Sequence, residues 1–509
     1  MSLATRRSIG KDQWPLAAAF VIYLVLLAFC ISRHELWGDE LHSWNIAKAS
    51  HSFTELIHNS RFEGHPPLWY TLMWALSKFS HNLIYLQWLQ GIIAGCAVSL
   101  LIFHSPFPVK ARLLLPFGYY FLFEYGVFSR NYAPALLICF CMLIVLKRAK
   151  SYRNAVYYPL LFLLANTHLL AAVLAAAIHI YYLLHQKEDG LRKPVLALHL
   201  LAGIVSILPA LYFIFPPSDS EMNLHFWMSR WSIRQLKDIA AAPAKSFVPL
   251  PAWWEYHFWN THFLINASYR WALLKPVIYL SSIVLTGLTF FILKENRKSS
   301  ALFFFNLLFT VAVATVFPLT SSRYVGFIFI GFIVAAWLYQ EEKPLTHKRE
   351  MGLYILLVLQ IAGSLVAVPR DIQYVFSNSS KVKELILEVP TGNRIVTDYY
   401  CLNNVLAYTD GPAYSIETNK LRSFILWEQK PKTAEESQTV YTDGASRLFK
   451  ESGLHSFYLL SSLPPETLAQ MDGQLGITYK VSLVDKREGA IEKYSNIYLY
   501  RISLIVAKM

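Results

Sequence analysis

Two adjacent carboxylates, Asp39 and Glu40, lie in the stretch GDELHSW, a few residues after the first long apolar run of the chain. An unshifted aspartate, with a pKa of about 3.9, is ionised at neutral pH and can accept a proton from a hydroxyl group while a new bond forms. Glu40 could steer a substrate or bind a metal, but a carboxylate that stabilises the start of a helix fits equally well. Asp39 is therefore either a candidate for proton transfer or a plain solvated carboxylate near the membrane, and Glu40 is a second catalytic candidate.

Two arginines are candidates for binding a phosphate group. Arg130 lies in EYGVFSRNYA together with Glu124 and Tyr132, and Arg323 lies in SSRYVG. A guanidinium group neutralises a phosphate well because it can donate two parallel hydrogen bonds. Tyr132 is a further phosphate-binding candidate or an interfacial aromatic residue. Glu124 is either a second acid that orients an acceptor or a partner of Arg130, and Arg323 could be a simple anchor.

A third group of residues could bind a metal ion. Glu63 and His65 lie in RFEGHPPLWY, where the two prolines disfavour helix at His65, and His168 lies in NTHLL. Histidine and glutamate side chains bind transition metals, but these three have no compact ligand spacing. The other five histidines of the first long loop are expected at the surface (34, 42, 51, 58 and 81).

Long apolar runs must position these residues. The chain of 509 residues is 55% apolar and only 16% charged, and runs of the length needed to cross a bilayer recur along it. This pattern predicts a polytopic α-helical membrane protein with about eleven spans. We place them at residues 16–31, 83–103, 113–128, 132–146, 155–165, 169–184, 195–215, 271–293, 301–317, 324–339 and 352–368, and the run at 155–165 is short enough to be half of a broken hairpin.

Basic residues predict the orientation of these spans. They crowd into short connections that lie on one side if every span crosses: Arg6, Arg7, Lys11, Lys110, Arg112, Lys147, Arg148, Lys150, Arg153, Lys187, Arg192, Lys193, Lys294, Arg297, Lys298, Lys343, Lys348 and Arg349. Such connections face the cytoplasm. The net charge of +13 is therefore mostly topological, which removes the main reason to expect nucleic acid as a partner.

Three long segments are expected on the other, extracytoplasmic side. The first covers residues 33–81, and the second covers residues 216–266, whose tryptophans we take as interfacial anchors, with HFWMSRWSIRQL as a helix in the headgroup plane. The third, residues 370–509, follows a transmembrane domain at 1–369. It alternates helical and strand patterns at 381–388, 394–397, 403–408, 423–427, 445–451 and 457–461 and closes with a strand at 497–505, which predicts a soluble α/β domain.

The order of these motifs resembles the lipid-dependent GT-C glycosyltransferases. GDELHSW, GHPPLWYTLMW, SRNYA, THLL and the late RY follow one another over about residues 31–330, and the bacterial relatives of protein O-mannosyltransferases and lipid A aminoarabinose transferases are the most similar group. The resemblance implies a GT-C fold in the cytoplasmic (inner) membrane. It also implies transfer of a sugar from a polyprenyl-phosphate donor to an extracytoplasmic lipid, glycan or protein acceptor, with inversion and with Asp39 as base.

The resemblance also implies a divalent metal ion held by an acidic residue and a distant histidine, here Glu63 and His168. The sequence FEGHPP departs from the family's FEKP by one residue, so either Glu63 or His65 could be the match. A transporter or flippase of lipid-linked saccharides is the main alternative function, although it predicts inverted repeats and charges near the bilayer midplane. A non-catalytic sensor or scaffold, whose tail binds a partner, is a third.

Overall fold

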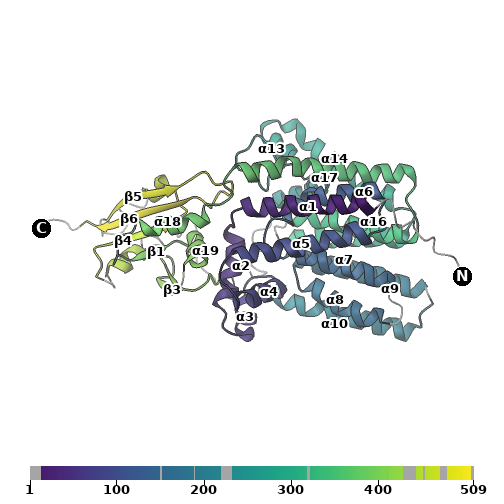
Figure 1. Ribbon diagram of the computed structural model, residues 1–509, viewed down its shortest axis with the longest axis horizontal. Helices are drawn as coiled ribbons and strands as arrows, with labels where there is room; N and C mark the ends of the chain where they lie inside the picture. Colours follow the sequence, from purple (N-terminus) through teal and green to yellow (C-terminus); the bar gives the residue numbers. More distant parts are fainter. Residues whose placement is uncertain are drawn as a thin grey trace.

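The computed structural model describes residues 13–148, 152–188, 190–218, 220, 232–317, 321–409, 411–427, 443–450, 453–469 and 479–505. A body of roughly parallel helices fills one part of the molecule, and a smaller region with a sheet packs against one end of it (Figure 1). We call this the sheet end of the helical body. The N-terminal end of helix α1 lies at the opposite end (Figure 1).

Eight helices within the described residues are long and apolar enough to cross a membrane. The chain is therefore a multi-pass membrane protein. The eight are α1 (Gln13–Arg33), α5 (Ile84–His104), α9 (Leu169–Glu188), α10 (Lys193–Ile214), the pair η3 (Ala272–Leu274) and α14 (Lys275–Leu293), α15 (Arg297–Val316), α16 (Ser322–Glu342) and α17 (His347–Gln373).

The expected count of eleven spans is too high by these criteria. The run at 113–128 forms no continuous helix, but is divided among α6 (Val109–Leu114), the 3-10 turn η1 (Leu115–Phe117) and the π-helix η2 (Tyr120–Glu124). Pro116, which lacks an amide hydrogen, and the extended Gly118 interrupt it. The other two runs form the shorter helices α7 (Tyr132–Arg148) and α8 (Arg153–Ala165), and α8 turns back into α9 at residues 166–168.

Basic connections meet at the end of the body opposite the sheet. Lys147 lies 3.1 Å from Glu341, and Lys298 lies 2.8 Å from Glu188. Arg349 pairs with Glu295 between the ends of α14 and α17. Connections that are far apart in the sequence thus share one end of the molecule, as the charge pattern predicts, and their assignment to the cytoplasm stays a prediction.

The described residues of the C-terminal region form a mixed six-stranded sheet of order β3-β2-β1-β4-β6-β5. Its strands are β1 (Ile395–Thr397), β2 (Ala413–Ser415), β3 (Lys420–Arg422), β4 (Ser456–Ser461), β5 (Tyr479–Arg487) and β6 (Ile497–Leu504), and β1 runs parallel to β2 and β4. Helices α18 (Val382–Leu387), α19 (Tyr399–Tyr408) and α21 (Pro465–Ala469) accompany it. The predicted strand at 423–427 is wrong, because these residues follow β3 without strand pairing, and β2, β3 and β5 were not predicted.

Hydrogen bonds fix the C-terminal region to the sheet end of the helical body. Helix α2 (Gly38–Ala49) lies against α19: Asn45 donates to the Asn403 carbonyl at 2.9 Å, and Lys48 donates to the Leu406 carbonyl at 2.7 Å. A cation at that place satisfies carbonyls left free at the end of a helix. The second long loop also takes part, since His257 contacts the Ile491 carbonyl at 2.8 Å. Helix α17 itself continues past residue 369 to Gln373.

The second long loop is described only in part. Residues 221–231, which carry most of the predicted headgroup helix, lie outside the described residues, and α12 (Ile233–Phe247) and α13 (Phe263–Arg270) follow them. Trp253 and Trp254 are exposed, whereas Trp259 packs edge-on against Trp37 at a ring distance of 4.8 Å.

Candidate functional site

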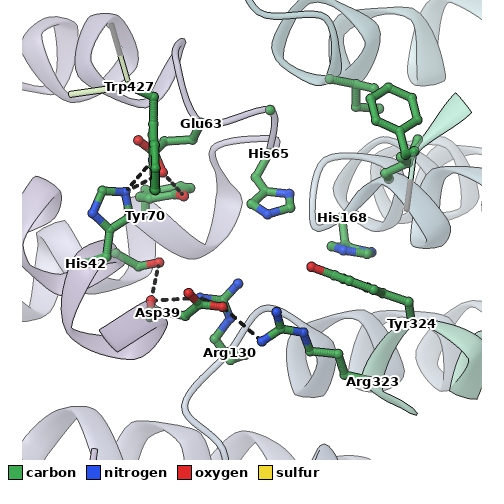
Figure 2. A pocket seen from close by; sticks show the side chains of 15 residues that line it. Asp39, His42, Glu63, His65, Tyr70, Arg130, His168, Arg323, Tyr324 and Trp427 are labelled. Carbon is green, nitrogen blue, oxygen red and sulfur yellow. Dashed lines mark hydrogen bonds and ion pairs between the residues drawn. The ribbon is translucent and has the colours of Figure 1, made fainter. Parts of the chain in front are cut away.

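Asp39 lies in the first turn of α2, with its side chain directed into a cavity at the sheet end (Figure 2). Trp37 precedes the helix, and its backbone amide donates to the Glu40 carboxylate at 3.1 Å, which fixes the start of α2. A carboxylate here gains from the positive end of the helix dipole. Asp39 keeps 38% of its side-chain surface accessible, so it is open to the cavity.

Two guanidinium groups flank the Asp39 carboxylate (Figure 2). Arg323, at the start of α16, donates to Asp39 Oδ2 at 2.9 Å, and Arg130, in the turn before α7, lies 3.7 Å from the same oxygen and donates to the Asp39 carbonyl at 2.7 Å. Burial raises the pKa of Asp39, but the charges of Arg323 and Arg130 outweigh it, so the pKa is lowered. Asp39 is therefore an anion at neutral pH.

The cavity around this cluster encloses about 260 Å³. Residues from at least seven separate parts of the chain line it, among them Asp39, Glu63, His65, Arg130, His168 and Arg323. These six were all predicted from the sequence as site residues. Leu169, Ile214 and Phe317, which lie at or next to the ends of α9, α10 and α15, add apolar surface to its lining.

A hydrogen-bonded network on another wall joins helix α2 and the turn at Glu63 to the C-terminal region. His42 Nε2 lies 2.6 Å from Glu63 Oε2, and the Trp427 indole lies 3.1 Å from the same nitrogen. Tyr70 also donates to Glu63, at 3.4 Å. Burial lowers the pKa of His42, but the Glu63 carboxylate outweighs it, and the pKa is raised. While His42 is protonated, its imidazolium ring places a positive charge near Asp39.

His65 and His168 face each other across the cavity with ring centroids 5.4 Å apart (Figure 2). Burial lowers the pKa of His65 to about 3 and that of His168 well below its usual value, and Arg130 adds to both effects. Both rings are neutral and could ligate a metal ion. Glu63 is instead engaged by His42 and Tyr70, and within the part of the chain that is described no group of three His, Cys, Asp or Glu side chains is arranged for a metal. The expected metal set is therefore not assembled.

A comparison of the chain with models of protein families and with curated proteins found no match. The geometry of the cavity is thus the basis on which a function can be proposed.

Gly64 allows Glu63 and His65 to line the same cavity. Its φ of +66° lies in the left-handed region, which costs other residues about 1–2 kcal/mol. The turn sends Glu63 toward His42 and His65 toward His168 (Figure 2). The EGHPP sequence therefore places Glu63 beside His42 and His65 beside His168.

Three predicted site residues lie behind the cavity wall instead of lining it. Glu40 is fully buried and accepts hydrogen bonds from the backbone amides of Trp37 and Ser129, so it braces the turn next to Arg130. Glu124 accepts from Tyr119 at 2.8 Å and Trp259 at 3.4 Å. Tyr132 is buried with its ring 5.2 Å from that of His168. These contacts favour supporting roles.

His34 connects Glu40 to the last span. Its Nδ1 lies 3.1 Å from Asp371 on α17, and its Nε2 lies 3.5 Å from Glu40. Burial lowers the pKa of His34, but Asp371 and Glu40 raise it to about 10. His34 and His42 are both buried, so their expected surface position is wrong.

The lining residues that were missed in the sequence include His42, Tyr70, Tyr324 and Trp427. One signal existed for His42, since it follows Asp39 by three residues and therefore shares its helix face. Trp427 carried no signal of a site, because it ends the short apolar run FILW, which was predicted as a strand, and lies 385 positions from its partner.

Proposed function

We propose that this protein is a membrane glycosyltransferase that moves a sugar from a polyprenyl phosphate to a hydroxyl acceptor. The observation that carries the proposal is the Asp39 carboxylate held between Arg130 and Arg323 in a cavity at the sheet end. The cluster offers a base and two phosphate-binding groups within one small volume. The resemblance to the GT-C enzymes supports the same reaction.

The reaction assigned to this cluster is an inverting displacement. An oxygen of the acceptor hydroxyl attacks the anomeric carbon of the donor sugar while the bond from that carbon to the phosphate oxygen breaks. Asp39 accepts the hydroxyl proton, and the polyprenyl phosphate leaves with the electron pair. Arg130 and Arg323 stabilise the negative charge that develops on the phosphate. No step requires a metal ion.

The bond between Arg323 and Asp39 suggests that donor binding releases the base. A phosphate that accepts from Arg323 competes with Asp39 for the same guanidinium, 2.9 Å away. When Arg323 turns to the phosphate, the Asp39 carboxylate loses a strong partner, and its affinity for a proton rises. Proton transfer is thereby favoured only when the donor is in place.

An apolar groove gives the polyprenyl chain a path. It is lined by α12, the start of α13, α14 and α17, with Val277, Leu280 and Val284 among its residues. His262 joins it to a polar cavity that contains Lys245, and this cavity shares Arg323 and Tyr324 with the site. A lipid tail in the groove would place its phosphate beside Arg323.

The proposal is tested by mass spectrometry of cell-envelope lipids and glycans from cells with and without the gene. We expect one hexose, pentose or aminosugar substituent to be missing in the deletion strain and restored by the wild-type gene, but not by an Asp39→Asn variant. An unchanged envelope overturns the proposal. Accumulation of an intact lipid-linked saccharide with no missing substituent would favour the flippase.

The proposed extracytoplasmic position of the sheet end has its own test. Cys401 is buried and unsuitable for labelling, whereas Leu387 is 84% exposed in α18. A Leu387→Cys variant should react with a membrane-impermeant maleimide added outside intact spheroplasts. Labelling only after lysis would reverse the orientation.

A further inference from the structure

A second cavity of about 180 Å³ lies on the other side of Asp39, between α2 and the C-terminal region. It shares Asp39, His42 and Trp427 with the first cavity, so these residues stand at the boundary of the two. The first cavity contains both arginines, whereas neither lines the second. A molecule in the second cavity would reach Asp39 from the side away from the phosphate-binding groups.

Aromatic rings form much of the second cavity. Tyr400 and Tyr494 stack with ring centroids 5.5 Å apart and an interplanar angle of 14°, and both are more than half exposed. Tyr399 meets Trp427 edge-on at 5.4 Å. An aromatic face that is partly open to solvent can stack on the C–H face of a sugar ring, while the polar tip of the side chain stays available for hydrogen bonds.

Short polar groups alternate with these rings. Asn403, Glu492 and Ser495 line the cavity, and Glu492 accepts hydrogen bonds from Ser495 Oγ at 2.8 Å and from the Tyr494 amide at 2.9 Å. Amide and hydroxyl groups can both donate to and accept from sugar hydroxyls, and a carboxylate can accept from them. A lipid chain would find no continuous apolar wall here, because polar groups interrupt the rings.

We propose that the second cavity binds a saccharide unit of the acceptor and presents one of its hydroxyl groups to Asp39. This inference rests on the proposed glycosyltransferase function and names the acceptor as a glycan. Donor and acceptor then enter from opposite sides of the base, and the C-terminal region, through Tyr494 and Trp427, recognises the acceptor. The arrangement suits an attack on the face of the anomeric carbon opposite the leaving phosphate.

The test measures glycan binding by the full-length protein in detergent. The probe is an array of lipid-free, phosphate-free oligosaccharides of hexose, pentose and N-acetylhexosamine units, with short unstructured peptides printed beside them. The variants are Tyr494→Ala, at 63% exposure, and the matched control Tyr152→Ala, at 62% exposure before α8. Binding of polyprenyl phosphate in micelles is measured for each variant as a second readout.

We expect at least one oligosaccharide to bind, with affinity at least tenfold weaker in Tyr494→Ala and unchanged in Tyr152→Ala. Polyprenyl phosphate binding should be the same in all three proteins. The inference is overturned if no oligosaccharide binds, if Tyr494→Ala binds normally, or if only peptides bind. Failure of the proposed function would be seen separately, as an unchanged cell envelope in the deletion strain.

Discussion

Replacing Asp39 by asparagine removes the proposed base and leaves the groups around it in place. Asparagine has nearly the same shape and can still accept a hydrogen bond from Arg323, now 2.9 Å from Asp39 Oδ2, so we expect the cavity to persist. The amide cannot take the acceptor's proton. Loss of a positioned general base lowers turnover about 10²–10⁴-fold, which corresponds to about 3–5 kcal/mol in the activation barrier.

The same change should strengthen donor binding. Arg323 no longer has to exchange a carboxylate for the phosphate, and we take about 1 kcal/mol as the part of that charge-assisted bond that asparagine removes. The dissociation constant for the polyprenyl-phosphate-linked sugar should then fall about fivefold. A merely structural role for Asp39 would lower turnover and donor affinity together.

The assay follows release of polyprenyl phosphate from the lipid-linked sugar that the envelope comparison identifies, with donor binding measured by thermophoresis. Asp485→Asn is the matched control, because Asp485 is 35% exposed and pairs with Arg487 at 2.6 Å in the sheet, away from the cavity. It should leave both quantities unchanged. Turnover of Asp39→Asn within tenfold of wild type, or weaker donor binding, would refute the reasoning.

Three further predictions follow from the same geometry. Arg323→Lys should weaken donor binding about tenfold, because an ammonium replaces a planar fork, and an unchanged dissociation constant in thermophoresis would contradict it. Val284→Trp fills the apolar groove and should raise the donor KM about tenfold in the release assay. The control Ile283→Trp changes a residue that is 70% exposed on the same helix and should leave the KM unchanged. Equal effects of the two variants would exclude the groove as the binding path of the lipid chain. The raised pKa of His34 means that its pairing stabilises the fold fully below its usual pKa of about 6.5, and that this stabilisation is lost as pH rises toward 10. The Tm measured against pH should fall over this window less steeply in His34→Gln, and identical slopes would refute the assignment.

The sequence was most informative where residue type and membrane geometry act together. Long apolar runs and basic connections predicted a multi-pass protein whose charged loops meet at one end, as Lys298 and Arg349 do. Once the spans are placed, Asp39, Arg130 and Arg323 must lie near one surface. That they share one cavity depends on packing between helices, which short motifs do not record.

The remaining parts of the site could not be predicted from the sequence, because they depend on contacts between residues that are far apart in the chain. In the sequence, Glu40 is as good a catalytic candidate as Asp39. In the structure, its carboxylate does not line the cavity and accepts hydrogen bonds from the backbone amides of Trp37 and Ser129. Successive residues on a helix face different directions, so adjacent carboxylates rarely act at one point. The buried state of His34 depended on Asp371, which is 337 positions away.

The order in which the chain is made has a consequence for this protein. Asp39 emerges early from the ribosome, while Arg323 comes much later and Trp427 follows the last span, α17. The cavity therefore stays incomplete during most of translation and membrane insertion. A prematurely terminated chain would contain Asp39 without Arg323 and Trp427. If the proposed function holds, transfer requires the chain through Trp427, and shorter fragments are expected to be inactive.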